Sequence, residues 1–178
     1  MRVDLKPHPD TPPGPIASIE VKVERHWKHG IKLTYLLRGD LEAIRFPVRA
    51  EAQHVDGLWR TTCFEAFVRD PAAAGYAEFN LAPSTAYAVY GFAGYREGMT
   101  GGYCSRATIT TATGDACFEL TAELDFHRAA HVTAEGPLMV ALSAVIEEMG
   151  GAKSYWALAH PPGKPDFHHA DGFVLELP

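Results

Sequence analysis

Alternation of side chains in the segment from Val55 to Asn80 constrains the fold more than any other feature of the sequence. The segment is typical of a loop, a strand that begins at Cys63, a turn and a second strand that begins at Tyr76. Side chains of a strand alternate between its two faces, and here both faces carry mostly apolar residues. The Arg-Asp-Pro and Ala-Ala-Ala-Gly sequences between the strands favour a turn, so we expect the two strands to pair as a covered hairpin.

Glu65 is the exceptional residue of this hairpin, because it lies on an apolar strand and close to Glu78 or Asn80. A half-buried carboxylate must find hydrogen-bond donors or serve a ligand. In one hypothesis Glu65 lies at the floor of a cleft, held by Asn80 or Arg96, and contacts a ligand. In the other it is a buried structural anion, which the position between Phe64 and Ala66 favours.

The remaining chain repeats the β pattern. Alternation and β-branched residues predict further strands near 18–24, 31–37, 43–48, 86–92, 103–113, 117–124, 137–146, 154–159 and 173–177. A short helical turn is expected over 125–132, with Phe126 pointing inward. These features predict an all-β fold: a two-sheet antiparallel β-sandwich of about ten strands, immunoglobulin-like or jelly-roll-like, with at most one short helix.

The length of 178 residues suits one domain that spans 1–178, in which the proline-rich residues 1–17 form an extended N-terminal arm. The net charge of −6 and the dispersed basic residues predict neither nucleic acid nor an anionic membrane surface as a partner. The N-terminus carries no apolar signal segment and no stretch is long enough for a membrane span, so we expect a cytoplasmic protein. The three cysteines are widely spaced, which favours reduced structural residues; they are Cys63, Cys104 and Cys117.

Aromatic residues are the first candidates for ligand binding. Trp59 follows Asp-Gly in a loop and is expected to be exposed, while Trp156 lies in a strand whose neighbour Tyr155 must point to the opposite face. Flat aromatic rings stack on sugar rings, and amide, carboxylate and guanidinium groups bond sugar hydroxyls. The two carboxylates Glu65 and Glu78 would also suit a glycosidase, but an enzyme is the minor hypothesis.

Histidine and methionine side chains provide the alternative chemistry. Met99, His160, His168 and His169 could ligate a haem iron, and no local motif is needed for a single His–Met pair. No zinc spacing, nucleophile elbow or phosphate-binding loop occurs in the sequence. We therefore expect no metal and no cofactor, with haem b as the alternative.

Four segments together resemble the DOMON-like proteins of bacteria, a superfamily related to the family 9 carbohydrate-binding modules: GLWRTTCFEAFV, YAEFNLAPS, YREGM and SYWALAHPPGKPDFHHADGFVLEL. The resemblance covers about Leu41 to Leu177. Trp59 to Phe67 is similar to the family 9 pattern W-x-x-D-x-V-E-x-F, in which Glu65 matches the glutamate and Thr62 replaces the aspartate.

What this resemblance implies is a non-catalytic module that binds a small-molecule ligand, a small carbohydrate above all. Trp59 and Trp156 would stack on the sugar, and Glu65, Asn80 and Arg96 would supply polar contacts. The cytochrome relatives imply the alternative, a b-type haem redox domain that uses Met99 and one of the histidines.

Overall fold

The computed structural model spans residues 1–178, and the structure describes all of them except 28, 50, 102–105 and 134, which include Cys104. The described residues form twelve strands and three short 3-10 helices, with no α-helix among them. The strands are β1 (Arg2–Pro7), β2 (Ile16–Trp27), β3 (Gly30–Gly39), β4 (Cys63–Arg69), β5 (Tyr76–Leu81), β6 (Tyr87–Phe92), β7 (Thr100–Gly101), β8 (Arg106–Thr113), β9 (Cys117–Asp125), β10 (Leu138–Glu147), β11 (Lys153–Ala157) and β12 (Leu175–Leu177). The 3-10 helices are η1 (Leu41–Ala43), η2 (Leu58–Arg60) and η3 (Ala170–Gly172). No helix in the described chain is long and apolar enough to cross a bilayer.

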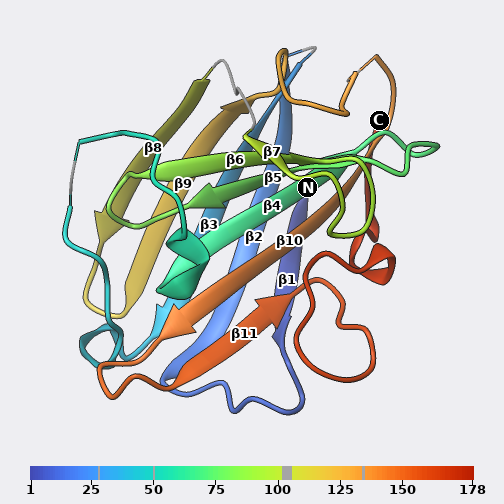
Figure 1. Ribbon diagram of the computed structural model, residues 1–178. Helices are drawn as coiled ribbons and strands as arrows, with labels where there is room; N and C mark the ends of the chain where they lie inside the picture. The colour runs from blue at the N-terminus through green and yellow to red at the C-terminus, as the bar shows by residue number, and fades with distance from the viewer. Residues whose placement is uncertain (28, 50, 102–105, 134) are drawn as a thin grey trace.

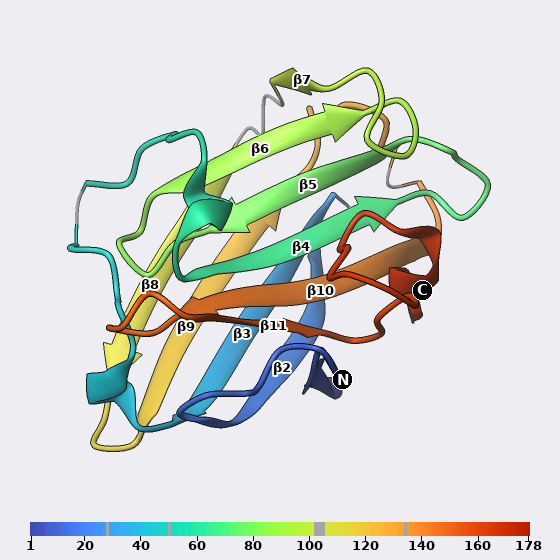
Figure 2. The ribbon, with the colours of Figure 1, turned by 60° about the horizontal axis from the view of Figure 1, so that its bottom comes forward.

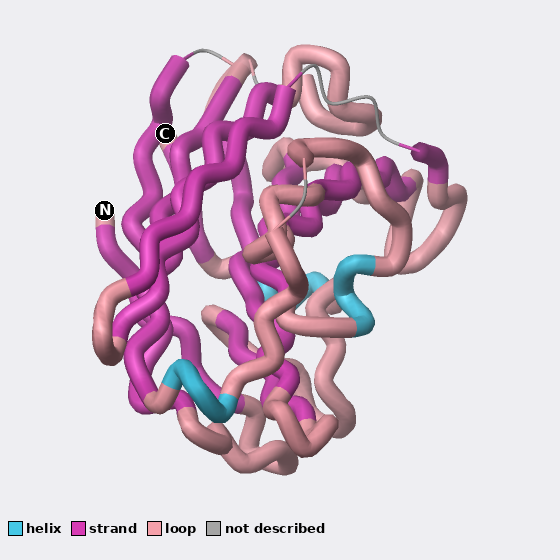
Figure 3. Tube along the Cα trace, turned by 90° about the vertical axis from the view of Figure 1, so that its left-hand side faces the viewer, coloured by secondary structure: helices cyan, strands magenta, loops and turns pink. Residues whose placement is uncertain are grey.

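The strands form one antiparallel sheet that curls into two layers (Figure 1, Figure 2). Its strand order is β7-β6-β5-β4-β10-β11-β1-β2-β3-β9-β8, and β12 pairs with the first part of β10. The front layer in Figure 1 contains β4 to β7, β10 and β11, and the rear layer contains β2, β3, β8 and β9. Figure 3 shows the two layers from the side. The predicted all-β class and its β-sandwich architecture are confirmed.

β1 joins the two layers, because its two ends pair with different partners. Lys6 and Pro7 pair with the end of β11, whereas residues 2–5 pair with β2 from Lys22 back to Ile19. The segment predicted as an extended arm therefore contains a strand. Pro7 is tolerated at the end of that strand, where a missing N–H costs no ladder hydrogen bond.

The main core lies between the layers, where the inner faces of both meet. Ile19, Val21 and Val23 of β2 are buried there together with Phe64 and Phe79 of the β4–β5 hairpin. Burial of each such side chain contributes about 1.5–3 kcal/mol to folding. The buried hydroxyl of Tyr35 crosses the core and donates to the carbonyl of Glu65 at 2.7 Å, so it leaves no unpaired polar group.

A second apolar cluster covers the outer face of the front layer. It consists of Phe67, Tyr76, Ala88, Tyr90, Phe92, Ala141 and Phe173, with Leu58, Met139 and Phe167 packed against it. The front layer is therefore buried on both faces, as the side-chain pattern of the hairpin predicted. Coverage of this outer face by η2 and by the segment that follows β11 leaves a cleft between them.

Two predicted elements differ in the structure. The strand expected over 43–48 is absent from the described chain, where η1 and a single bridge between Ile44 and Glu148 occur instead. Pro47 explains this, because proline has no N–H to donate to a ladder. The helical turn expected over 125–132 is a series of turns, although Phe126 is fully buried as predicted.

Two strands of the structure were not predicted. β1 and β7 lie in proline-rich and glycine-rich sequence, which is atypical of strands. β6 continues through Gly91, where a Cβ atom would lie 2.5 Å from the Cβ of Ala130. Glycine is therefore required at this position by the close approach of the 126–132 turns, and it does not break the strand.

Candidate functional site

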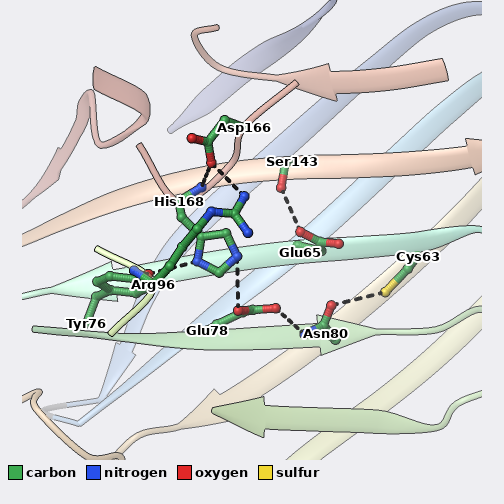
Figure 4. Close-up of polar contacts among 9 residues, drawn as sticks. All are labelled: Cys63, Glu65, Tyr76, Glu78, Asn80, Arg96, Ser143, Asp166 and His168. Atoms are coloured by element: carbon green, nitrogen blue, oxygen red, sulfur yellow. Dashed lines mark hydrogen bonds and ion pairs between the residues drawn. The ribbon is translucent and has the colours of Figure 1, made fainter. Parts of the chain in front are cut away.

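A cleft of about 510 Å³ opens on the outer face of the front layer. It is lined by Trp59, Glu65, Glu78, Tyr90, Phe92, Arg96, Met99, Val145, Tyr155, Pro165, Phe167 and His168. Its floor comes from β4, β5, β6, β10 and β11, and its walls come from η2, the β6–β7 loop and the loop after β11. Figure 4 shows the polar residues at this face of the sheet.

Strand register places the polar groups together on the floor. Glu65 lies opposite Asn80 on β5 and opposite Ser143 on β10, while Glu78 lies opposite Phe67 on β4. Directly paired residues of an antiparallel sheet share a face, so Glu65 and Glu78 are diagonal neighbours on one face. Residues at such positions have Cα atoms about 7–8 Å apart, within reach of one ligand.

Glu78 is held by the strand that carries it. Its Oε1 accepts a hydrogen bond of 2.6 Å from Nδ2 of Asn80, and it is only 5% exposed. Burial raises the pKa of Glu78 to about 7, against the opposing effects of Asn80 and of the charge on Arg96. Near neutral pH this carboxyl group is therefore poised between its neutral and ionised forms.

The hydrogen bonding of the Glu65 carboxyl group is weaker than either hypothesis predicted. Oε2 accepts a hydrogen bond from Oγ of Ser143 at 3.4 Å, whereas Asn80 bonds Glu78 and not Glu65. Burial raises the pKa of Glu65 well above its usual range, and the charge of Glu78 raises it further. The idea that Asn80 holds Glu65 is thus wrong, because the Nδ2 of Asn80 donates to Glu78 and its Oδ1 accepts from the thiol of Cys63.

His168 joins the floor to the wall. Its Nδ1 lies 2.8 Å from the hydroxyl of Tyr76, and that hydroxyl accepts the backbone N–H of Arg96 at 3.2 Å. The hydroxyl proton is then directed at Nδ1, which assigns the ring proton to Nε2, 3.7 Å from Oε2 of Glu78. Burial lowers the pKa of His168 to about 4, so this approach to Glu78 is not an ion pair at neutral pH.

Arg96 lines the cleft, as the sequence predicted. Its Nη2 donates to Oδ1 of Asp166 at 2.8 Å, and the hydroxyl of Tyr95 donates to Oδ2 of the same carboxylate. The backbone of Arg96 has a φ of 55°, a left-handed conformation that costs non-glycine residues of the order of 1–2 kcal/mol. The backbone hydrogen bonds between Ala93, Gly94 and Glu97 hold this turn in place.

Trp59 lies at the mouth of the cleft with 40% of its surface exposed, in agreement with the sequence. Its ring meets Tyr90 edge to face at a centroid distance of 5.8 Å. The hydroxyl of Tyr90 donates to Asp56 at 2.8 Å, which ties β6 to the loop before η2. The indole is therefore positioned by neighbours, yet leaves area accessible to a ligand.

Trp156 does not line the cleft, contrary to the sequence prediction. It is 3% exposed and belongs to the main core, where its Nε1 donates to Oγ of Ser154 at 3.0 Å. Tyr155, its neighbour in β11, lines the cleft instead, since successive side chains of a strand point to opposite faces. Asn80 is fully buried beneath the cleft and supports Glu78 without reaching the lining.

The fold places the four predicted haem ligands in different parts of the structure. Met99 and His168 line the cleft, whereas His160 bonds the carbonyl of Lys6 and His169 lies near Asp171. The two ring nitrogens of His168 face Tyr76 and Glu78, so His168 as arranged presents no nitrogen to an iron. Among the described residues no group of three or more His, Cys, Asp or Glu side chains could hold a metal ion.

Thr62, which stands in place of an aspartate of the family 9 pattern, has a structural role. Its hydroxyl donates to the carbonyl of Arg45 at 2.8 Å and accepts the N–H of Glu147 at 3.0 Å. It therefore fastens the segment before η2 to the end of β10. Cys63 is free and buried, and Cys117 is free and partly exposed.

Tyr90, Tyr155, Phe167 and Asp166 belong to the site and were not predicted. The alternation of Tyr155 with Trp156 indicates that they occupy opposite faces, but not which of them faces the cleft. Asp166 and Phe167 lie in a loop, and no periodic pattern in the sequence indicates which face of the sheet such a loop covers.

Comparisons with known proteins agree with the architecture. No family model matches the sequence, and no curated protein matches it. A similar solved structure is a "putative carbohydrate-binding protein" from Bacteroides uniformis ATCC 8492, with a TM-score of 0.70, 17% identity, and coverage of 97% of this chain and 84% of that one. Family 9 carbohydrate-binding modules from Caldicellulosiruptor kristjanssonii are more distant. The complex with cellotriose has a TM-score of 0.48 at 11% identity over 82% of this chain and 67% of that one; the complex with glucose has 0.47 at 11% over 89% and 76%. At this level of identity the Bacteroides structure supports the fold alone.

Proposed function

We propose that the chain is a non-catalytic module that binds a small carbohydrate in the cleft on the outer face of the front layer. The observation that carries this proposal is the combination of an exposed indole at the mouth with buried polar groups on a rigid floor. An aromatic ring covers the apolar face of a pyranose, while fixed donors and acceptors select its hydroxyl groups. The description of the Bacteroides structure as a "putative carbohydrate-binding protein" is consistent with the proposal.

The polar groups are pre-organised for hydroxyl recognition. Glu65 and Glu78 lie on neighbouring strands, and Arg96 is fixed by Asp166, so little side-chain entropy is lost when a ligand binds. A neutral carboxyl group both donates and accepts, which suits a sugar hydroxyl that also does both. The volume of about 510 Å³ falls within the range of small-molecule sites, about 300–1,000 Å³.

Catalysis is disfavoured by the protonation of the same two residues. Glycoside hydrolysis needs one carboxyl group as an acid and a second that is ionised, as nucleophile or base. Burial raises the pKa of both Glu65 and Glu78, so neither floor carboxyl is fully ionised near neutral pH, as a nucleophile or base would need to be. We therefore expect no release of nitrophenol from nitrophenyl glycosides.

Haem binding has no support from the geometry of His168, and we do not propose it. A haemin titration checks this point, because ligation by Met99 and His168 would give a sharp Soret band that His168→Asn abolishes. We expect no such band.

Titration calorimetry with mono- and disaccharides tests the carbohydrate proposal. Saturable binding should be present in the parent and weakened in Trp59→Ala. Absence of binding to every neutral, basic and acidic sugar tried would refute the proposed function.

A further inference from the structure

The cleft carries an excess of acidic groups, which distinguishes it from a site for neutral sugars alone. Three carboxyl groups lie in or beside it, those of Glu65, Glu78 and Asp166. Arg96 is the one guanidinium among the described lining residues. Its Nη2 bonds Asp166, and although its charge lowers the pKa of both floor carboxyls, no cation of the described residues is hydrogen-bonded to them.

His168 does not supply the missing positive charge. Its pKa is lowered to about 4 by burial and by Arg96, so the imidazole is neutral near pH 7. Its Nδ1 is occupied by Tyr76, and in the described part of the chain the floor carboxyls accept hydrogen bonds from the amide of Asn80 and the hydroxyl of Ser143. Both donors are neutral. The floor can therefore accept a cation from outside.

Aromatic rings around the acidic floor favour the same kind of ligand. Trp59, Tyr90, Tyr155, Phe92 and Phe167 all line the cleft. An ammonium group is attracted to the faces of such rings, most strongly where water is partly excluded. A cluster of aromatic rings with carboxylates at its base thus has complementary chemistry for a protonated amine.

From this arrangement we infer that the preferred ligand is an amino sugar, whose ammonium group lies over Glu65 and Glu78 while its ring lies against Trp59. The inference rests on the proposed function and adds the ligand class. Removal of the ammonium group would leave the floor carboxyls without a cation, and an acidic sugar would place a like charge beside them.

Proton release accompanies such binding. A cation over the floor stabilises the ionised form of Glu78, whose pKa of about 7 leaves it partly protonated in the free protein. Binding of an amino sugar at a pH just below 7 should therefore release protons to the buffer, and binding of the parent hexose should not.

The test compares three pairs that differ by one group: glucose and glucosamine, galactose and galactosamine, mannose and mannosamine, with glucuronic acid as the anionic member. Calorimetric titrations at low ionic strength and pH 6.5, in buffers of different ionisation enthalpy, give affinity and proton release together. In at least one pair the amino sugar should bind about tenfold more tightly than the hexose, with proton release, and glucuronic acid should bind most weakly.

Glu78→Gln provides the variant and Glu119→Gln its matched control. Glu119 is an exposed residue of β9 in the rear layer, so its substitution removes the same charge far from the cleft. Glu78→Gln should reduce the preference for the amino sugar to less than about threefold and abolish proton release, whereas Glu119→Gln should keep both. A melting curve of each variant confirms that it is folded.

The outcomes distinguish the amino-sugar inference from the proposed carbohydrate-binding function. If hexoses bind as tightly as their amino sugars in all three pairs, or glucuronic acid binds best, the inference is overturned while carbohydrate binding stands. If no sugar binds, both are overturned. A preference that persists in Glu78→Gln would show that the floor carboxyl is not its source, and would also overturn the inference.

Discussion

The guanidinium of Arg96 and the carboxylate of Asp166 meet at 2.8 Å and so join two loops whose residues are 70 positions apart. Asp166 also accepts hydrogen bonds from the hydroxyl of Tyr95 and from the backbone N–H of His168. One carboxylate therefore orients a wall of the cleft and the loop that carries His168.

Replacement of Asp166 by Asn should weaken sugar binding by about three- to tenfold, since Arg96 would lose its charged partner and sample other rotamers. Stability should change by less than about 1 kcal/mol, because the pair is largely exposed on its Arg96 side. Calorimetry and thermal melting check the two effects. Asp171→Asn, an exposed change in η3, serves as the control, and equal loss of affinity in both variants would contradict the role of Asp166.

Trp59 and Trp156 should respond in opposite ways to substitution by alanine. Trp59→Ala should cost about 1–2 kcal/mol of sugar-binding free energy with little change in melting, because the ring is exposed at the cleft. Trp156→Ala should cost about 3–5 kcal/mol of folding free energy, because it leaves a cavity in the main core. Chemical denaturation and calorimetry on both variants measure these effects, and each variant is the control for the other.

Glu65→Gln should be tolerated. Burial raises the pKa of Glu65 well above its usual 4.5, so the folded parent carries a neutral carboxyl that an amide resembles, and below pH 4.5 the free energy of unfolding should change by less than about 1 kcal/mol. As the pH rises above 4.5, the unfolded parent releases this proton while the folded parent retains it, so the parent loses stability and the variant should become the more stable of the two. Denaturant titrations at acid and neutral pH measure the difference. A large loss at neutral pH would instead support the hypothesis of a buried structural anion.

Glu78 should make stability fall between pH 4.5 and about 7. Its pKa is 4.5 in the unfolded reference and about 7 in the folded protein, so the folded state binds more protons across this window. The stabilisation is complete below pH 4.5 and is lost as the pH rises, by roughly 2–3 kcal/mol for a shift of this size. Glu78→Gln should abolish this part of the pH dependence, and denaturant midpoints across the window should show it. A parallel decline in Glu119→Gln is expected, because that variant retains Glu78.

His168 should make stability fall as the pH becomes more acidic, which is opposite in sign to the effect of Glu78. Its folded-state pKa of about 4 lies below the usual 6.5, so the unfolded state binds the proton first. Stability is therefore lost as the pH falls from 6.5 towards 4. His168→Asn keeps an acceptor for the hydroxyl of Tyr76 and should flatten this acid-side loss. If the variant loses as much stability as the parent when the pH falls from 6.5 towards 4, groups other than His168 cause that loss.

The sequence by itself determined the β class, the β4–β5 hairpin and the exposure of Trp59, because these follow from local alternation and turn chemistry. The hairpin extends over the expected residues, and Glu65 lies opposite Asn80 as its pattern allowed. The curl of one sheet into two layers was decided by tertiary structure, since it depends on pairing of β1 with both β2 and β11. That long-range pairing leaves no periodic signal in proline-rich residues.

Tertiary structure also decided which side chains form the cleft. The alternation of Tyr155 and Trp156 shows that they point apart, but which one faces the core depends on the layer packed against β11. Glu78 rather than Glu65 bonds Asn80, because side-chain rotamers are chosen by the surrounding packing and not by register alone. Asp166 reaches Arg96 only because the loop after β11 folds back over the outer face. Local pattern therefore fixes which face a residue can occupy, and long-range packing selects its partners there.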